Sequence, residues 1–448
     1  SIDGKAIDLS YASTEPLQQI LRKQNQYLWF LPQHEEHETE ALLSYNKDKL
    51  TQAVQALKGF EEDFAQAPTN AHISEYTPEA GFSIVAETQG NELDQAKTLE
   101  VIGNAVEELK GLVDLDAEGC YETPAVTSDS EELQNTLQKL QKYGTVTITY
   151  RFGDNIEVLD GSTISTWLEV DGFAVTLDQT QVENYVATLR KKYDSIFRSR
   201  TFMTSYGKEI TVDGGDYGWW MNYQQEAKEL AAQIETGESG ERMPVYYQTA
   251  ASYGAPDYGD TYVEINLTAQ HLFLYSNGQR ILESDFVSGK PYGHETPPGT
   301  YAVTYTQKYA ILRGDTYETM VSYWMPFNED IGLHDATWQS QLGSNLYQSI
   351  GSHGCVNLSY NVAKEMFNYV EKGMAVICYE LPGTESSSIT PQSDEEKAQS
   401  VIDAINEIAT SSKPAKQAAN ARMLYKQLSS AAKAKVTNYS DLLAYEAG

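Results

Sequence analysis

Apolar and polar residues alternate in part of the second half of the chain. The alternation runs through residues 262–267 and again through 271–275, and the dipeptide Asn277-Gly278 follows directly. A period of two predicts strands with one buried face, and Asn-Gly favours the tight turn of a hairpin. The continuous apolar run at 375–379 predicts a buried strand that closes the same region. We therefore expect a mainly-β domain over residues 253–384.

A helical spacing prevails towards the N-terminus. Apolar residues recur at intervals of three and four within 39–66, 94–112 and 223–234, which predicts amphipathic helices. The last two helices lie in stretches that resemble each other. Each stretch has a short alternating strand, a Gly turn, the helix and an extended segment with Pro and Tyr. This weak repeat predicts two α+β domains, at 1–135 and 136–252.

The C-terminal residues form a third kind of region. Residues 385–393 contain a run of three serines and Pro391, and Pro382 lies just before them, which is typical of a linker. Residues 394–448 are rich in Ala and Lys, and Pro414 is placed to begin a helix. A helical module of this size is expected to pack on a neighbour. The predicted fold is thus multidomain α+β, with α+β repeats, a mainly-β domain and a small helical module.

Composition narrows the function. The chain has 448 residues, of which 41% are hydrophobic, enough for several packed cores. Its 32 Lys and Arg against 64 Asp and Glu give a net charge of −32, which argues against nucleic acid as a partner. There are three cysteines, Cys120, Cys355 and Cys378, so disulfides do not hold the fold together.

One of these cysteines lies in a segment with the composition of an active site. The string is Ser352-His353-Gly354-Cys355-Val356-Asn357, and His334 precedes it in the chain. A thiol attacks a carbonyl as thiolate, so it needs a base within reach. Gly354 permits a close approach of the backbone, and the N–H groups of 354 and 355 are expected to help form an oxyanion hole. We predict Cys355 as nucleophile and His334 as general base.

The order of His334 and the 352–357 string resembles the active site of the YkuD-type L,D-transpeptidases. Two further segments are similar to the opening of that catalytic domain, Phe286-Val287-Ser288-Gly289 and Thr296-Pro297-Pro298-Gly299. The resemblance implies a peptidoglycan cross-linker without cofactor or metal. Its cysteine takes the acyl group of a donor tetrapeptide stem, D-alanine leaves, and the amine of an acceptor stem completes a 3→3 cross-link. With water as acceptor, the enzyme would be an L,D-carboxypeptidase.

The resemblance also assigns roles to single residues. It implies that the tautomer of His334 is set by a backbone carbonyl just after it, and that Ser352 and His353 line the thiol. Asn357 is expected either to pin the loop or to contact substrate. Tyr292, His294 and Tyr309 are candidates for a lid or a substrate wall, although surface aromatics in a Tyr-rich chain need no function.

The N-terminal repeats resemble the paired peptidoglycan-binding domains of Firmicute L,D-transpeptidases, most closely in Asp213-Gly214-Gly215-Asp216-Tyr217-Gly218-Trp219. Trp219 and Trp220 either bind glycan or pack the junction between strand and helix. We expect a wall-associated protein on the extracellular face of the envelope. The chain begins at Ser1 without Met and has no run of 18 apolar residues. The resemblance implies an N-terminal membrane anchor, which we expect to be missing from this sequence.

Other functions fit the sequence less well. A sortase would need an arginine soon after the cysteine, and papain-like amidases place Cys before His. A catalytically silent wall-binding protein would have little reason to keep His334 and the 352–355 residues intact. His34 and His37 are three apart rather than four, so they do not predict a zinc site.

Overall fold

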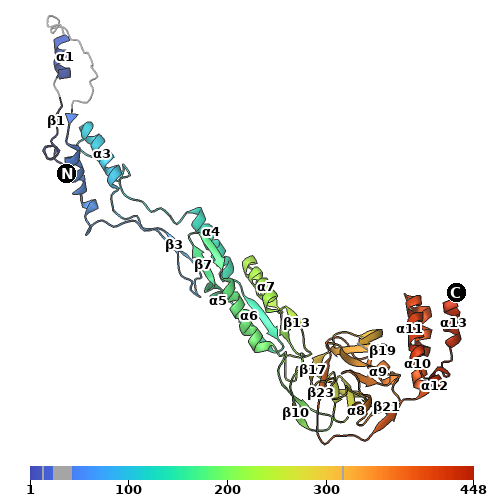
Figure 1. The fold of residues 1–448 in the computed structure, drawn as a ribbon. Coiled ribbons are helices and arrows are strands. Elements are labelled where there is room, and N and C mark those ends of the chain that lie inside the picture. The colour runs from blue at the N-terminus through green and yellow to red at the C-terminus, as the bar shows by residue number, and fades with distance from the viewer. Residues whose placement is uncertain (13–14, 24–42, 315–316, 448) are drawn as a thin grey trace. The chain divides into compact units, whose positions relative to one another are not determined.

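The computed structural model describes residues 1–12, 15–23, 43–314 and 317–447, which form a mixed arrangement of helices and strands (Figure 1). This confirms the predicted α+β class. The chain forms two compact units, one of residues 1–147 and 160–178 and one of 148–159 and 179–448. The histidines at 34 and 37 lie outside the described residues. The limits of the individual domains stay a prediction.

The first part of unit 1 is a pair of helices. Helices α2 (Lys47–Gln55) and α3 (Gln95–Glu107) pack around Ile7, Leu50 and Val54. Within the described part of 39–66, the predicted helix shrinks to α2 and a short 3-10 turn, because the Asn46 side chain caps α2 at Lys49. The other elements are η1 (Gly4–Ile7), β1 (Ser10–Tyr11), α1 (Glu15–Lys23), β2 (Leu43–Ser44), η3 (Lys58–Phe60), β3 (His72–Ile73) and β4 (Ile84–Val85).

The rest of unit 1 is built on α4 (Glu131–Gly144). Helix α5 (Gly161–Ser165) begins directly against the end of α4, where a Cβ on Gly161 would lie 1.6 Å from the carbonyl oxygen of Gly144. A side chain is therefore excluded at Gly161. The hairpin of β7 (Leu168–Asp171) and β8 (Ala174–Leu177) completes this unit.

Unit 2 begins with a three-stranded sheet and two helices. Strand β5 (Ile148–Phe152) pairs with β6 (Asn155–Leu159) and, in parallel, with β12 (Gly240–Arg242). Helices α6 (Gln179–Tyr193) and α7 (Tyr223–Thr236) contact each other. The predicted apolar stripe of α7 is buried along its length, at Ala227, Leu230, Ala231 and Ile234.

The catalytic region, residues 253–384 in the prediction, is a sandwich of two sheets. The first sheet runs in the order β16 (Gln279–Asp285), β15 (His271–Ser276), β14 (Tyr262–Asn266), β23 (Ala375–Tyr379) and β17 (Gly299–Ala302). The second runs β18 (Gln307–Gly314), β19 (Tyr317–Asn328), β20 (Ile331–Asp335) and β22 (Val356–Leu358). Side chains from both sheets and from α9 (Tyr360–Met366) share one core. The Asn277-Gly278 turn is confirmed, with φ of 50° and 74°.

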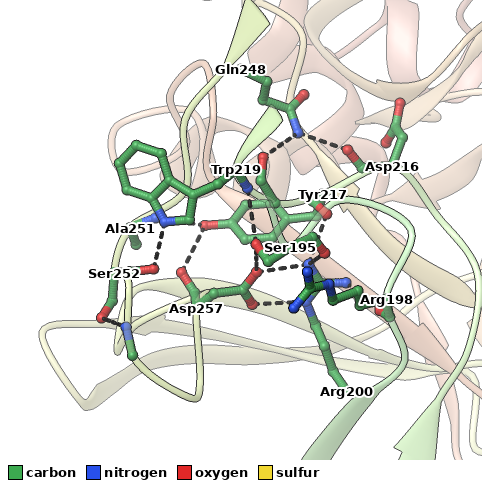
Figure 2. A network of polar contacts seen from close by, with 12 residues as sticks. Ser195, Arg198, Arg200, Asp216, Tyr217, Trp219, Gln248, Ala251, Ser252 and Asp257 are labelled. Atoms are coloured by element: carbon green, nitrogen blue, oxygen red, sulfur yellow. Dashed lines mark hydrogen bonds and ion pairs between the residues drawn. The ribbon is translucent and has the colours of Figure 1, made fainter. Parts of the chain in front are cut away.

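The strand pair β9 (Arg200–Met203) and β10 (Glu209–Val212) packs on the first sheet, and the segment Asp213–Trp219 follows it along β17. The N–H of Tyr217 donates to Thr300 O at 3.0 Å. A Cβ on Gly215 would lie 2.0 Å from the same oxygen, so glycine is required. Arg200 and Asp257 form a buried ion pair at 2.7 Å beneath Tyr217 (Figure 2). The 213–219 segment, which resembles the family, therefore connects strand β17 of the first sheet to the region around β9 and β10.

The predicted linker contains a short strand. β24 (Ile389–Pro391) pairs with β21 (Gln341–Gly343), and Asp285 accepts hydrogen bonds from Ser388 and Thr390 at 2.9 and 2.7 Å. Ser388, one of the serines that suggested a linker, thus helps Thr390 to hold this segment in place.

The C-terminal module packs on the catalytic region, as expected for its size. Its apolar core includes Met320 of β19, and the Gln427 side chain donates to the Met320 carbonyl at 3.2 Å. Helix α11 begins at Pro414, as predicted. The elements are α10 (Asp394–Asn406), η4 (Glu407–Thr410), α11 (Pro414–Gln427), α12 (Ser430–Lys433) and α13 (Tyr439–Ala447).

Within the described residues, no helix combines the length and the hydropathy that crossing a bilayer demands. The same ranges contain no group of three or more His, Cys, Asp and Glu side chains arranged for a metal ion.

Candidate active site

Two strands bring the predicted residues together. β20 carries His334, and Cys355 directly precedes β22, which pairs with β20 in parallel so that His334 lies opposite Asn357. A cavity of about 250 Å³ lies at this place. Ser352, His353, Cys355, His334 and Asn357 line it, whereas Gly354, Tyr292 and His294 do not.

His334 is buried, and its ring is fixed by a backbone contact. Nδ1 lies 2.9 Å from the carbonyl oxygen of Asp335, as the resemblance implied. A carbonyl can only accept, so Nδ1 carries the proton and Nε2 keeps its lone pair. Burial lowers the pKa of His334 to about 4, so the imidazole is neutral at pH 7.

The thiol of Cys355 is half-buried beneath the β18–β19 hairpin. It packs near Ala310, Val321 and Trp324, and its Sγ lies 3.5 Å from the carbonyl oxygen of Asp330. Burial raises the pKa of Cys355 to about 11. The resting thiol is therefore protonated and donates towards Asp330.

The loop before Cys355 is held by Ser352. Its hydroxyl donates to the Cys355 carbonyl at 2.6 Å and accepts from the Gly354 N–H at 3.0 Å. The N–H of Gly354 is thus occupied in this conformation, contrary to the expectation that it faces an oxyanion. Among the described residues, none accepts a hydrogen bond from the Cys355 N–H.

Gly354 has a different role that the sequence did not indicate. Its φ of 122° suits glycine, and a Cβ there would lie 2.8 Å from the Ile331 side chain. Thr296 donates its hydroxyl to the Gly354 carbonyl at 2.6 Å and accepts from the Gly289 N–H at 3.1 Å. The Ser-Gly and Thr-Pro-Pro-Gly segments therefore support the cysteine loop directly.

Known proteins share both parts of this chain. Residues 260–378 match the YkuD family model, described as the L,D-transpeptidase catalytic domain. Residues 2–114 and 126–242 each match a model described as "Putative peptidoglycan binding domain". A crystal structure of a cysteine-to-serine mutant of Enterococcus faecium L,D-transpeptidase is 34% identical, and the match covers 55% of this chain and 100% of that one, with a TM-score of 0.45. The chain belongs to the YkuD-type L,D-transpeptidase family.

Further structures are similar to this L,D-transpeptidase. The Ldtfm–avibactam carbamoyl enzyme is 35% identical over 55% of this chain and 98% of that chain, with a TM-score of 0.45. An NMR structure of the E. faecium catalytic domain is 42% identical over 27% of this chain and 97% of that chain, with a TM-score of 0.26. No curated protein matched the chain. The C-terminal helical module lies beyond the matched family segments, the last of which ends at residue 378.

Of the remaining predicted residues of this L,D-transpeptidase, His353 lies at the cavity, His294 lies beside His353, and Tyr292 does not line the cavity. His353 is exposed, and its ring contacts that of His294 at a centroid distance of 4.5 Å. Burial and His294 lower the pKa of His353. Tyr292 is 96% exposed, and Glu295 accepts hydrogen bonds from the N–H groups of Tyr292 and Gly293. His294 therefore borders the site through His353, whereas Tyr292 does not touch the cavity.

The structure narrows the role expected of Asn357 and corrects that of Tyr309. Asn357 is tied to Val287 by two backbone hydrogen bonds, at 2.9 and 3.1 Å, and its buried side-chain oxygen has no partner among the described residues. The loop is therefore not pinned by a hydrogen bond to that oxygen. Tyr309 is not a substrate wall, because its hydroxyl donates to Glu407 at 2.9 Å and its ring packs on the C-terminal module.

Sequence reasoning missed the aromatic surroundings of His334. Trp324 and Trp338 have ring centroids 5.7 and 5.8 Å from that of His334. Trp338 follows His334 closely and lines the cavity, so its position in the chain could have indicated it. Trp324 is the β19 partner of His334, which only the strand register reveals.

Proposed function

We propose that this L,D-transpeptidase forms 3→3 peptidoglycan cross-links by acyl transfer through Cys355. The observation that carries the proposal is the pairing of Cys355 with His334 on one cavity, with the Nε2 lone pair of His334 left free by the Asp335 contact. Its substrates are the donor and acceptor stem peptides, and its place is the wall at the outer face of the cell.

In the first half-reaction, Cys355 attacks the carbonyl between the third residue of a donor tetrapeptide and its terminal D-alanine. The sulfur–carbon bond forms as the thiol proton passes to Nε2 of His334. The Cys355 N–H, which has no acceptor among the described residues, donates to the oxyanion. The carbon–nitrogen bond then breaks, the leaving amine takes the proton from His334, and a thioester remains.

In the second half-reaction, the side-chain amine of an acceptor stem attacks the thioester. It gives its proton to His334, the new amide bond forms, and the carbon–sulfur bond breaks as the thiolate regains a proton. Water in place of the amine would release a free tripeptide stem, the outcome of an L,D-carboxypeptidase. Product masses from a tetrapeptide donor with and without an amine acceptor separate the two.

The first test is covalent labelling by a carbapenem. One of the similar structures is the E. faecium catalytic domain acylated by ertapenem. We expect a single ertapenem adduct in the intact mass of this protein and none in Cys355→Ser. Cys120 and Cys378 are buried and serve as internal controls. No adduct on the folded wild-type protein, or an adduct that persists in Cys355→Ser, would contradict the assignment.

The second test separates the two histidines. His334→Ala should lose about 10²–10⁴-fold in acylation rate, since it removes the base. His353→Ala should lose less, because the thiol proton passes to His334 and the exposed His353 ring only borders the cavity. Equal losses in the two variants, measured by stopped-flow or timed mass spectrometry, would argue against these two roles.

A further inference from the structure

The turn after helix α6 displays an aromatic ring at a conformational cost. Ser195 to Arg198 form a turn closed by the Arg198 N–H donating to Ser195 O at 3.3 Å, and Phe197 occupies its third position with φ of 60°. Gly and Asn adopt this region readily, whereas a bulky residue there is a clear outlier. The Phe197 side chain is also 68% exposed. Neither its backbone conformation nor its burial explains a phenylalanine at this position.

Hydrogen bonds fix this turn against β11 (Trp220–Met221). The N–H groups of Ser195 and Ile196 donate to Trp219 O at 3.0 and 3.2 Å, and the Trp219 N–H donates to Ser195 Oγ at 2.9 Å (Figure 2). Gly218 permits the approach, since a Cβ there would lie 2.6 Å from the Ile196 nitrogen. The position of Phe197 relative to β11 is therefore determined by several contacts.

The two adjacent tryptophans have different environments. Trp219 is buried, stacks on Tyr253 at 3.8 Å and donates its indole N–H to Ser252 O at 2.7 Å (Figure 2). It packs the junction, which was the alternative to glycan binding. Trp220 is half-buried and contacts Phe197 and Tyr247, with centroid distances of 6.4 and 4.8 Å. Tyr247 belongs to β13 (Tyr246–Gln248), the partner of β11, and is 53% exposed.

We propose that Phe197, Trp220 and Tyr247 form a platform that binds the sugar rings of a peptidoglycan glycan strand. The inference deepens the proposed function and rests on its peptidoglycan substrate. Two of the three residues lie in the second segment that matches the peptidoglycan-binding family model. Aromatic rings held in a fixed geometry offer a large apolar contact area at low entropic cost, and the C–H faces of pyranose rings stack on them.

The charge of the protein favours the glycan over the charged parts of the wall. At a net charge of −32, the chain is not drawn to stem carboxylates or to phosphate polymers by its overall field. Binding through ring stacking needs no such attraction. We therefore propose the uncharged sugar rings of the strand as the ligand of the platform. A stem peptide and a second copy of the protein are the alternative ligands that the test distinguishes.

The test compares Phe197→Asn and Tyr247→Ala with the wild-type protein and with Tyr369→Ala, an exposed aromatic outside the platform. The probes are purified sacculi and glycan strands freed of stem peptides by an amidase. Loss of one platform ring should weaken binding to both probes about five- to thirtyfold. Tyr369→Ala should bind like wild type. Phe197→Asn should also melt at the wild-type temperature or higher, because Asn tolerates the left-handed backbone.

Each contrary result overturns the proposal. Wild-type affinity in Phe197→Asn and Tyr247→Ala, or no binding by the wild-type protein, would show that the platform does not hold glycan. Binding to sacculi but not to stripped strands, measured at high salt so that the lactyl carboxylates freed by the amidase are screened, would identify the stem peptide as ligand. If sedimentation velocity shows a dimer of the wild-type protein and a monomer of Phe197→Asn, the platform binds a second copy of the protein. A lower melting temperature of Phe197→Asn would show a structural role. The ertapenem adduct of the wild-type protein tests the proposed function separately.

Discussion

The resting thiol of Cys355 is predicted to react slowly with a simple alkylating agent at neutral pH. Burial raises its pKa to about 11, and the Asp330 carbonyl accepts its S–H at 3.5 Å. Burial also lowers the pKa of His334 to about 4. Both shifts favour a neutral thiol and a neutral imidazole over a thiolate–imidazolium pair, so the base must take the proton during the attack on a carbonyl.

The magnitude follows from these values. With a pKa of about 11, roughly 10⁻⁴ of the thiol is ionised at pH 7, against about 3% for a free cysteine with a pKa near 8.5. The thiolate fraction is thus roughly 300-fold lower, and the greater nucleophilicity of a more basic thiolate offsets part of this loss, so alkylation should be roughly 20–30-fold slower than that of free cysteine. Because the pKa is raised, the thiolate fraction grows about tenfold for each pH unit up to the region of pH 11. His334 has lost its proton well below pH 6 and adds no inflection.

The assay is the rate of iodoacetamide modification at Cys355 between pH 6 and pH 9, followed by peptide mass mapping. Cys355→Ser reports any reaction at the buried Cys120 and Cys378. We expect the logarithm of the rate to rise linearly with pH and to show no plateau. A plateau with an apparent pKa below 7, or reaction at pH 7 as fast as that of free cysteine, would refute the reasoning and indicate a preformed ion pair.

Three other predictions concern the support of the site. Burial raises the pKa of Asp335 to about 6, so ionisation of this carboxyl opposes folding and the free energy of unfolding falls as the pH rises from about 4 to 6. Asp335→Asn should remove this pH dependence. In chemical denaturation at pH 7.5, the variant should be more stable than wild type by up to about 3 kcal/mol. Ser352→Ala leaves the Gly354 N–H and Cys355 carbonyl without their partner, so it should cost about 1–3 kcal/mol and slow ertapenem acylation. Met320→Ala should cost about 2–5 kcal/mol where the C-terminal module meets β19, and faster hydrogen exchange in β18–β19 would reveal it. Unchanged denaturation curves or exchange rates would contradict each prediction.

Local signals allowed much of the fold to be predicted. Asn277-Gly278 forms the expected tight turn because both residues tolerate positive φ. The apolar run 375–379 is strand β23, and the stripe of α7 is buried as its spacing predicted. Pro414 begins α11 because its fixed φ suits the first helical turn. In each case the deciding interaction lies within a few residues of the chain.

The candidate site could be predicted from the sequence only in part. The residue types around Cys355 indicated a nucleophile, and the backbone carbonyl just after His334 was expected to set the tautomer, a local contact that the structure contains. The hydrogen bond from the Gly354 N–H to Ser352 was not anticipated, because loop conformation decides which amide is free.

The sequence by itself determined many of the helices, strands and turns, among them β23, α7 and the Asn277-Gly278 turn, and which family the chain resembles. The tertiary structure decided which residues meet. Parallel pairing of β20 with β22 places His334 beside the Cys355 loop, and the register of β19 sets Trp324 against His334. Tyr309 packs on the C-terminal module and therefore does not lie at the site. These contacts join residues of different strands and helices, so they depend on strand register and on which faces the whole fold buries, and the local sequence pattern does not specify either.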